Sequence, residues 1–499
     1  MHFLIKIAPE ISVKSPKVKR RMTRQLKENI TIPLKTLSPE IIITGGWDRV
    51  EIETPDTVEI FQNMERILAR TPGIAFTLAG KRIANSTEIP KNPSFTFPDG
   101  ESKGTAEMEH IASVITESYQ AHLQNMSFVV RIKRSGVHSF TSPEIERFVG
   151  GVILQNIPSA RVDLHTPQIM VTAEIKEKTL FIPHKKIMGM GGFPIQKLNR
   201  VLMLISGGYD SGVAAYLMMK RGCAVDFCFF NLGGQAHEVG VKQVSYYLSK
   251  EFSHGYVGNI FTVPFEGVVK DLLENTPARY RGVLLKRMML RSAEQIAKEG
   301  KHIALVTGES LAQVSSQTLK NLTVIEDAVQ IPVFRPLLTM EKQEIITLAE
   351  KIGTEVFARS MPEYCGVISQ KPSTGSDKKD ILEAESHFHF PVLEDAIVRK
   401  KREGVQQVEM NVADIGNVER TSEVEENSIL VDIRAPGEQQ RSPLKEVHIC
   451  IPFYDLKEKI LTLDASKTYL LFCQKGVLSR LHALYLQDKG LKIKIYRPE

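Results

Sequence analysis

A buried strand that runs directly into a glycine- and serine-rich turn, and then into a helix, most constrains the fold of this chain. Residues 201–205 form a continuous apolar run, as in strands buried on both faces. The turn reads Ser206-Gly207-Gly208-Tyr209-Asp210-Ser211-Gly212, and a helical pattern covers 211–221. Strand and helix patterns then alternate at 225–230, 238–252, 282–299 and 303–306. This alternation predicts a doubly wound α/β domain with its site at the carboxyl ends of parallel strands.

The composition of the turn indicates an anion site. Gly207 and Gly208 let backbone N–H groups approach a ligand closely, and Ser206 and Ser211 add hydroxyl donors at a helix N-terminus. The turn resembles the SGGxDS loop of the ATP pyrophosphatases, which cleave ATP between the α and β phosphates and adenylate a substrate. Asp210 within a phosphate loop points to Mg²⁺ as a second cofactor, with Asp210 as its ligand and as a catalytic group. A tight turn with nothing bound is the alternative.

Cys473 stands at the end of an apolar strand, residues 469–472, and ahead of a helix at 478–489. Backbone N–H groups in such a loop, together with Lys475, stabilise an anionic sulfur, which suits a thiolate or a persulfide. The loop resembles the active loop of rhodanese domains. The alternative is a buried cysteine acting as a small hydrophobe, the role expected of the cysteines at 223, 228 and 450. Cys365 lies beside Pro and Gly residues and is expected to be an exposed loop thiol.

Positive charge is concentrated in the first part of the chain. Residues 1–35 contain nine Lys or Arg against two Glu, and Lys17, Arg20 and Arg21 fall in one cluster. A second basic stretch includes Lys133 and Arg134. This asymmetry predicts RNA binding through phosphate neutralisation, and a solvated helix face is the alternative.

The cysteine count and the hydropathy pattern exclude several classes of protein. Five cysteines without a CxxC pair fit neither a disulfide framework nor a zinc ribbon. The N-terminus lacks the apolar run of a signal peptide, and no apolar stretch approaches the ~18 residues of a membrane span. We therefore expect a cytoplasmic protein without a membrane partner, in which thiols stay reactive.

Taken together, these motifs resemble the bacterial tRNA 4-thiouridine synthetases, also called tRNA sulfurtransferases, in their long form with a C-terminal rhodanese domain. The resemblance spans essentially the whole chain. Besides the Ser206–Gly212 turn and the Cys473 loop, it is carried by residues 191–194, 229–234, 285–289, 306–309, 313–317 and 361–369.

The resemblance implies an α/β multidomain chain. Its expected parts are a ferredoxin-like α+β domain at 1–61, a THUMP RNA-binding domain at 62–170 and a linker at 171–195. A doubly wound parallel-sheet ATP pyrophosphatase (PP-loop) domain at 196–373, a linker at 374–420 and a rhodanese-like domain at 421–499 follow.

The family's nucleotide contacts fall on a set of residues beyond the turn itself: Leu204, Ile205, Lys286, Gly308 and Gln317. The family's redox-active pair falls on Cys365 and Cys473, where the resemblance implies a disulfide formed on turnover. The implied substrate is uridine 8 of tRNA, and the implied sulfur donor is a cysteine desulfurase that loads Cys473.

The implied reaction adenylates the uracil C4 oxygen and replaces it with persulfide sulfur from Cys473. Cys365 either frees hydrosulfide from the persulfide or resolves a disulfide-linked intermediate after direct attack. The alternatives are a tRNA 2-thiolase, another PP-loop enzyme such as an amidating synthetase, and a sulfur-relay carrier for thiazole synthesis. A second role as donor to a thiamine-biosynthesis sulfur-carrier protein, and a homodimeric state, are left open.

Overall fold

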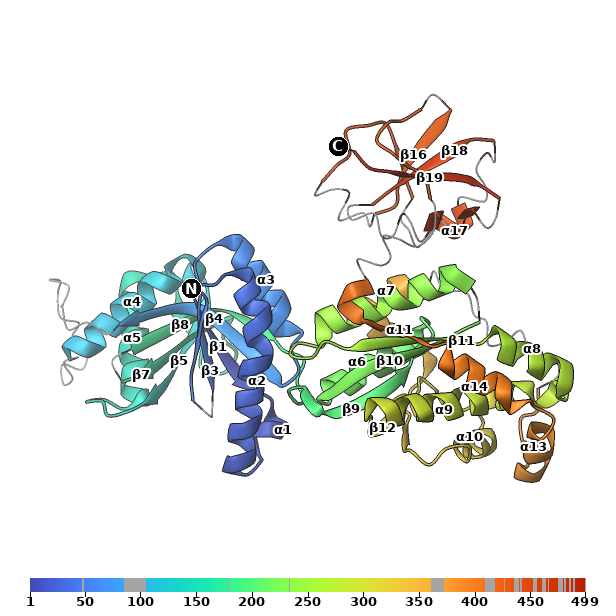
Figure 1. The fold of residues 1–499 in the computed structure, drawn as a ribbon. Helices are drawn as coiled ribbons and strands as arrows, with labels where there is room; N and C mark the ends of the chain where they lie inside the picture. The colour runs from blue at the N-terminus through green and yellow to red at the C-terminus, as the bar shows by residue number, and fades with distance from the viewer. Residues whose placement is uncertain are drawn as a thin grey trace. The chain divides into compact units, whose positions relative to one another are not determined.

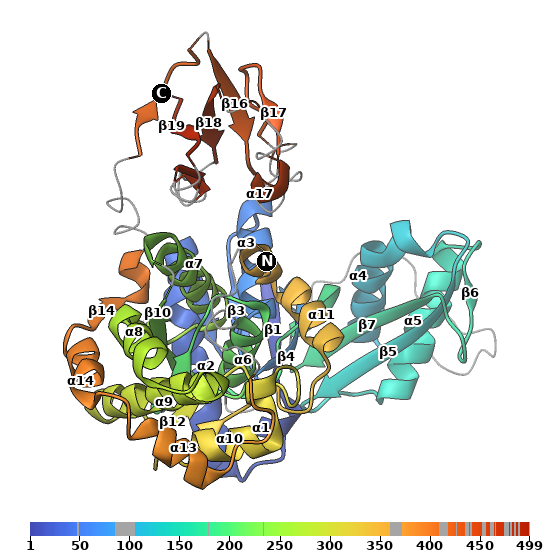
Figure 2. The same cartoon turned by 90° about the vertical axis from the view of Figure 1, so that its right-hand side faces the viewer.

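The computed structural model describes the chain except at residues 47–48, 85–104, 178, 233, 360–371, 409–417, 426, 435–438, 440–441, 452–455, 460–463, 465, 474–478, 480–481, 484–485, 488–489 and 499. It divides into two compact units, Met1–Gly192 and Phe193–Glu499 (Figures 1 and 2). Among the described residues, no helix is long and apolar enough to cross a membrane.

The first unit is built on an eight-stranded mixed sheet. In order across the sheet, its strands are β2 (Ile42–Thr44), β3 (Val50–Glu53), β1 (His2–Ile7), β4 (Ile74–Ala84), β8 (Thr179–Met188), β7 (Ile169–Lys176), β5 (Ser127–Ser135) and β6 (Arg161–Val162). Strands β5, β6 and β7 are parallel, and the remaining pairs are antiparallel.

Amphipathic helices cover one face of this sheet. They are α1 (Pro9–Ser12), α2 (Pro16–Leu37), α3 (Val58–Ala69), α4 (Ala106–Leu123) and α5 (Ser142–Asn156). In α5, a capping box between Thr141 and Glu144 satisfies backbone donors at the helix start, and Phe148 and Ile153 enter the core. The segment 171–188 lies in β7 and β8 rather than in the predicted linker. The expected linker does not hold for this segment, because Val171, Ala173 and Ile175 alternate with more exposed residues and are buried in the sheet.

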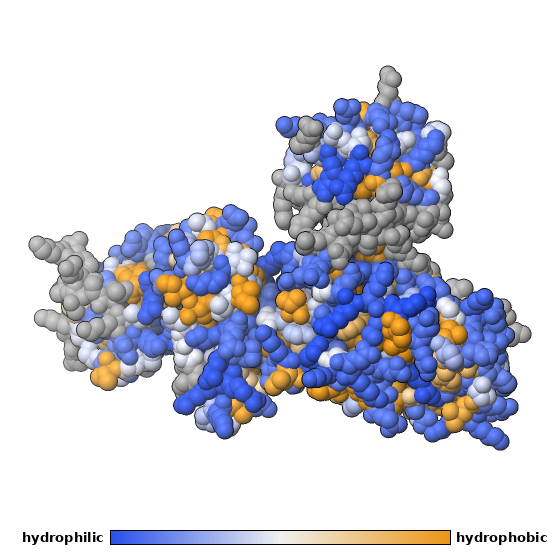
Figure 3. All heavy atoms as spheres, in the orientation of Figure 1, coloured by the Kyte–Doolittle hydropathy of each residue, from blue (hydrophilic) through white to orange (hydrophobic). Residues whose placement is uncertain are grey.

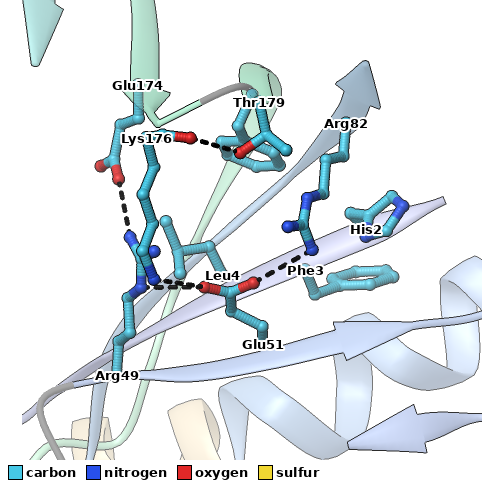
Figure 4. Close-up of a pocket in the computed structure, with 10 residues that line it drawn as sticks. His2, Phe3, Leu4, Arg49, Glu51, Arg82, Glu174, Lys176 and Thr179 are labelled. Atoms are coloured by element: carbon cyan, nitrogen blue, oxygen red, sulfur yellow. Dashed lines mark hydrogen bonds and ion pairs between the residues drawn. The ribbon is translucent and has the colours of Figure 1, made fainter. Parts of the chain in front are cut away.

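The opposite face of this sheet carries paired charges (Figure 4). Glu51 accepts contacts from Arg49 at 2.8 Å and Arg82 at 3.4 Å, and Glu174 contacts Lys6 at 3.0 Å. Arg49, Glu51, Arg82 and Glu174 border a cavity of only about 40 Å³. The pairs neutralise one another across strands, so this face combines both signs of charge.

The second unit contains a six-stranded sheet. Its strands, in order, are β13 (Val333–Phe334), β12 (Ala304–Val306), β9 (Gln196–Leu204), β10 (Cys223–Asn231), β11 (Asn259–Pro264) and β14 (Lys401–Gly404). The first five are parallel and β14 is an antiparallel edge. Since the strand order reverses between β9 and β12, their carboxyl ends form the topological switch point where ligands bind such sheets.

Helices pack on both faces of this sheet (Figures 1 and 2). One layer contains α6 (Tyr209–Lys220), α7 (Gly234–Phe252), α11 (Lys342–Ile352) and α12 (Glu355–Ala358). The other contains α8 (Glu266–Asn275), α9 (Arg281–Gly300), α10 (Leu319–Glu326), α13 (Lys378–Glu385) and α14 (Phe390–Val398). The prediction of a doubly wound sheet is confirmed.

The predicted linker at 374–420 is instead largely part of this unit. Ile381, Phe388 and Leu393 lie in its hydrophobic core, and β14 pairs with β11. Charged residues between these apolar positions hide the helical period in the sequence, so the sequence predicted a linker here.

A separate five-stranded sheet ends the chain. Its strands β15 (Arg420–Thr421), β19 (Lys492–Tyr496), β18 (Thr468–Phe472), β16 (Ser428–Asp432) and β17 (Ile449–Cys450) are all parallel, and α17 spans Leu456–Lys459. Apolar side chains from β16, β18 and β19 form its core. This small α/β arrangement agrees with the fold class predicted for the C-terminal segment.

Candidate nucleotide and sulfur sites

The serine–glycine turn joins β9 to α6 in a conformation that only some residues adopt. Gly207 has φ +83°, in the left-handed region that favours glycine, and Gly208 is the N-cap of α6. The Ser211 hydroxyl accepts a hydrogen bond from the Ser206 backbone N–H at 3.2 Å and lies 3.2 Å from Oγ of Ser206. These contacts fold the turn around the N-terminus of α6, where backbone N–H groups attract anions.

The last residue of β9, the residue after it and a histidine contact the turn or hold its start in place. Leu204 ends β9, and the N–H of Ile205 donates to the Cys228 carbonyl at 2.9 Å. His237, at the start of α7, donates from Nε2 to the Ser206 carbonyl at 3.0 Å. Burial lowers the pKa of His237, so its ring is neutral near pH 7. His237 was not predicted, because nothing in its local sequence distinguishes it from a core histidine.

Gly308 brings the end of β12 against the first turn of α6. A Cβ atom at this position would lie 2.7 Å from the backbone nitrogen of Ser211 and 2.8 Å from the carbonyl carbon of Asp210. Only glycine fits without a backbone shift. The predicted residues Gly308 and Ser211 therefore meet at the switch point.

Asp210 is held by two side chains from distant parts of the chain. Its Oδ1 accepts from Lys342 Nζ at 2.6 Å, and its Oδ2 accepts from Gln313 Nε2 at 3.1 Å. Lys342 is 132 residues from Asp210 in the sequence and was not predicted. Its side chain is 43% exposed, which leaves the ammonium accessible at the mouth of the turn.

A second charge cluster lies beside Gly308. The Glu309 carboxylate accepts from Lys286 Nζ at 2.7 Å, from Arg335 Nε at 2.9 Å and from the Thr307 hydroxyl at 3.1 Å. Burial alone would raise the pKa of Glu309, but the two cations outweigh it and the pKa is lowered. Glu309 is therefore charged at neutral pH, and the predicted residue Lys286 lies at the same strand end as the turn.

Gln317 ends a short 3₁₀ turn, Ser315–Gln317, and follows Gln313, whose side chain contacts Asp210, by four residues. The segment before it is held by a hydrogen bond from the Ala312 N–H to the Gln317 carbonyl, with Ala312 at φ +61°. Gln317 is buried, and in the described part of the chain its Oε1 has no hydrogen-bond partner. A buried acceptor without a partner is costly in a folded protein, so this atom fits contact with a ligand donor.

These groups fit a nucleoside triphosphate. The turn supplies backbone and hydroxyl donors, Lys286 and Lys342 supply positive charge, and Gln317 offers a free acceptor. Among the residues that the structure describes, no cluster of three His, Cys, Asp or Glu side chains forms a metal site. Asp210 alone therefore suits Mg²⁺ only in the usual manner, as one carboxylate beside phosphate oxygens.

Cys473 directly follows β18, as predicted, but it is 4% exposed. Its Sγ accepts from the Ser479 backbone N–H at 3.3 Å and lies 3.4 Å from the Ser479 hydroxyl. The sulfur therefore has polar neighbours at the strand end, beside the apolar side chains of the C-terminal core. Residues 474–478 of its loop, including Lys475, and Cys365 lie outside the described residues.

The remaining cysteines differ from one another in exposure. Cys228 is buried in the six-stranded sheet, and burial raises the pKa of its thiol, as expected for an inert cysteine. Burial also raises the pKa of Cys223, which is partly exposed. Cys450 is exposed, so the prediction that it is a buried hydrophobe is wrong. It lies on β17, an edge strand of the C-terminal sheet.

The predicted basic residues lie on two elements of the first unit. Lys17, Arg20 and Arg21 are exposed on α2, a strongly hydrophilic part of the surface in Figure 3. Arg24 and Lys27 continue the row one and two turns later and, with Arg20, line a groove of about 420 Å³ that reaches Gly46. On β5, Lys133 is exposed and Arg134 is half-buried.

A glycine–serine turn at the switch point of a doubly wound sheet, with lysines around it, defines an α/β nucleotide-binding domain of the PP-loop ATP pyrophosphatase class. The family model described as "Thiamine biosynthesis protein (ThiI)" matches residues 197–390, and that described as "THUMP domain" matches residues 105–183. The first match includes α13, and the second extends past the predicted boundary at 170.

Sequence relatives identify the family. The tRNA sulfurtransferases of Yersinia pestis (strain Pestoides F) and Yersinia pseudotuberculosis serotype IB (strain PB1/+) are each 42% identical over 504 residues, covering 100% of both chains. The chain belongs to the tRNA sulfurtransferase family. The family prediction and the predicted enzyme class are thereby confirmed.

Solved structures agree with the fold. A crystal structure of a 4-thiouridine synthetase–RNA complex with bound ATP matches with a TM-score of 0.68 and 24% identity, covering 81% of this chain and 98% of that chain. PH1313 from Pyrococcus horikoshii matches with a TM-score of 0.52 and 21% identity, covering 71% and 100%. At these identities the similarity establishes the fold.

Proposed function

We propose that the chain uses ATP to replace the C4 oxygen of uridine 8 in tRNA with sulfur, giving 4-thiouridine. The observation that carries this proposal is the meeting of the Ser206–Ser211 turn, Gly308 and Lys286 at the switch point of a sheet. The family supports tRNA as the substrate, and the related 4-thiouridine synthetase was solved with RNA and ATP. Cys473 adds the sulfur chemistry that an ATP site alone lacks.

In the first step, the phosphates of ATP lie on the turn, and the uracil C4 oxygen attacks the α-phosphate. Pyrophosphate leaves, and the C4 oxygen becomes part of a good leaving group. Backbone N–H groups of the turn, with Lys286 and Lys342, offset the charge that develops on the phosphates. Mg²⁺, held by Asp210 and the phosphates, would add charge neutralisation there.

In the second step, a persulfide on Cys473 supplies sulfur to C4, and AMP leaves. By direct attack, the outer sulfur bonds to C4, and the Cys365 thiolate then breaks the sulfur–sulfur bond. By the hydrosulfide route, Cys365 attacks the Cys473 sulfur first, and the freed hydrosulfide attacks C4. Both routes end in a Cys365–Cys473 disulfide, which a cellular dithiol must reduce with two electrons.

The polar contacts of Cys473 suit this role. The Ser479 N–H donates to its sulfur, so a sulfur atom carried at this strand end has a polar partner beside the apolar core. We propose a cysteine desulfurase as the source of the persulfide, and a thiamine-biosynthesis sulfur-carrier protein as a second acceptor. A reducing cytoplasm fits a cysteine pair that must be reopened in every cycle.

The cations on α2, together with Lys133 and Arg134 on β5, are proposed to bind the phosphate backbone of the tRNA. Arg20, Arg24 and Lys27 are spaced so that they share one side of the helix, and they line a groove in which Glu28 is the one acidic residue of the described chain. Phosphate contacts position an RNA without reading its sequence, so these residues orient the substrate rather than select uridine 8. We also propose a homodimer as the active state.

Mass spectrometry of tRNA nucleosides, after incubation with ATP, a desulfurase and cysteine, tests the proposal. The wild type should form 4-thiouridine with release of AMP and pyrophosphate. Cys473→Ala should abolish multiple turnovers while ATP and tRNA binding persist, and Cys450→Ala, at an exposed cysteine of the same sheet, should act like the wild type. Formation of 2-thiouridine would assign another thiolase. Sulfur transfer without tRNA-dependent ATP cleavage would leave a sulfur-relay carrier.

A further inference from the structure

Glu309 is the centre of a compact charge cluster behind the nucleotide turn. One carboxylate oxygen accepts from Lys286 at 2.7 Å, and the other accepts from Arg335 and the Thr307 hydroxyl at 2.9 and 3.1 Å. Because Glu309 directly follows Gly308, the cluster is tied to the strand end that packs on Ser211. The Glu309 carboxylate therefore fixes the position of Lys286 relative to the turn.

The members of this cluster differ in exposure. The side chains of Glu309 and Arg335 are 9% and 8% exposed, whereas that of Lys286 is 21% exposed. Arg335 is held from a second side by Glu326, and in the described residues its Nη2 has no partner. Lys286 is thus the member with access to solvent, and Arg335 is the fixed counter-ion of Glu309.

We propose that Glu309 is a positioning residue that holds Lys286 ready for the nucleotide phosphates and then yields it to them. When Lys286 leaves for a phosphate oxygen, Glu309 keeps its hydrogen bonds from Arg335 and Thr307. The carboxylate is therefore not left buried without a partner, which would otherwise make the exchange costly. This inference rests on the proposed ATP site and names a residue that acts through Lys286.

A second buried carboxylate that contacts α9 provides a matched control. Glu385 accepts from Arg287 at 2.7 Å and from Arg291 at 3.2 Å, and Arg287 is buried next to Lys286 in α9. Like Glu309, Glu385 anchors α9 through a buried carboxylate, but its partners are Arg287 and Arg291. A general disturbance of α9 would appear in variants of either carboxylate.

The test is a double-mutant cycle on ATP affinity, measured by calorimetry on the full chain. We expect Glu309→Gln to weaken ATP binding roughly tenfold, the scale of one charged hydrogen bond. In a Lys286→Met background the same change should not weaken ATP binding further, because Glu309 acts on the nucleotide only through Lys286. Glu385→Gln should leave ATP affinity within about twofold of wild type, although its unfolding temperature should fall because Arg287 loses its buried partner.

Three results would overturn the inference: unchanged ATP affinity in Glu309→Gln, a loss that adds fully to that of Lys286→Met, or the same loss in Glu385→Gln. If Glu309→Gln does not fold, Glu309→Asp replaces it, because the shorter carboxylate keeps a charge for Arg335 and retreats from Lys286. It should also weaken ATP binding only when Lys286 is present. A wild type that fails to bind ATP would remove the proposed nucleotide site itself, which separates the two failures.

Discussion

Replacing Gly308 with alanine tests the contact between β12 and α6 on which the nucleotide site depends. The new Cβ would lie 2.7 Å from the Ser211 nitrogen, 2.8 Å from the Asp210 carbonyl carbon and 2.9 Å from the Ser211 Cα. All three atoms belong to the backbone, so no change of rotamer relieves the overlap. The strand end and the first turn of α6 must therefore separate.

The size of that separation sets the expected effect. Ordinary van der Waals contact begins at 3.4 Å, so the 2.7 Å approach must lengthen by about 0.7 Å. Overpacking of this kind lowers the free energy of unfolding by about 1–3 kcal/mol. A shift approaching 1 Å between reacting groups lowers the rate by about 100-fold, so kcat/KM for tRNA thiolation should fall by that order.

Thermal unfolding and ATP-dependent thiolation measure the two effects of Gly308→Ala. Gly150→Ala is the control, because a Cβ in this α5 position would meet only a Val130 methyl at 3.9 Å. Removing a helix glycine there should leave activity unchanged and raise stability slightly. If Gly308→Ala unfolds at the same temperature as the wild type and thiolates tRNA at the same rate, the inferred close contact between β12 and α6 is refuted.

Three further changes test other parts of the molecule. Lys342→Ala removes the cation at 2.6 Å from Asp210 and should slow tRNA-dependent pyrophosphate release at least tenfold. Lys351→Ala, on the same helix, is the control. Equal rates in the two variants would refute a role for the Lys342 ammonium. Burial alone would raise the pKa of Asp226, but His302 and Arg200 lower it from 3.8 to about 2. The resulting stabilisation of about 2 kcal/mol is complete above pH 3.8 and lost toward pH 2. The wild type should therefore lose more unfolding free energy than Asp226→Asn over that range. Parallel curves of unfolding free energy against pH for the two proteins would contradict this expectation. Arg24→Gln with Lys27→Gln should lower the salt dependence of tRNA affinity by a slope of about 2, whereas Lys270→Gln in the second unit should not, and an unchanged slope would point to a structural role.

The sequence contained enough information for the features whose parts are consecutive. The Ser206–Gly212 turn needs a buried strand before it and a helix after it, and all three follow one another in the chain. The same holds for Cys473 at the end of β18. Parallel strands recognised by their apolar runs also predict that Gly308 and Ser211 share one sheet edge.

Features that depend on distant partners could not be predicted in this way. Lys342 reaches Asp210 across 132 positions, and nothing local marks it as different from other helix lysines. Helix α2 continues to Leu37 despite Pro33, a residue that would ordinarily predict an earlier helix end, because Ile30 and Leu34 are fully buried and tertiary packing outweighs the lost hydrogen bond. Exposure of Cys450 likewise depends on its edge strand, which apolar neighbours alone do not reveal.

The two charge clusters at the nucleotide turn follow one electrostatic arrangement. Asp210 is shared by an exposed lysine, Lys342, and by Gln313; Glu309 is shared by the more exposed Lys286 and by buried Arg335. In the proposed reaction, each lysine is already held by its carboxylate when the phosphates arrive, so ATP binding does not have to order a long, flexible side chain. The carboxylate keeps a second partner, so the lysine can turn to a phosphate oxygen without leaving an unpaired charge. Clusters of this kind therefore place positive charge in advance where negative charge develops as the α-phosphate bond breaks, which needs no reorganisation at the moment of reaction.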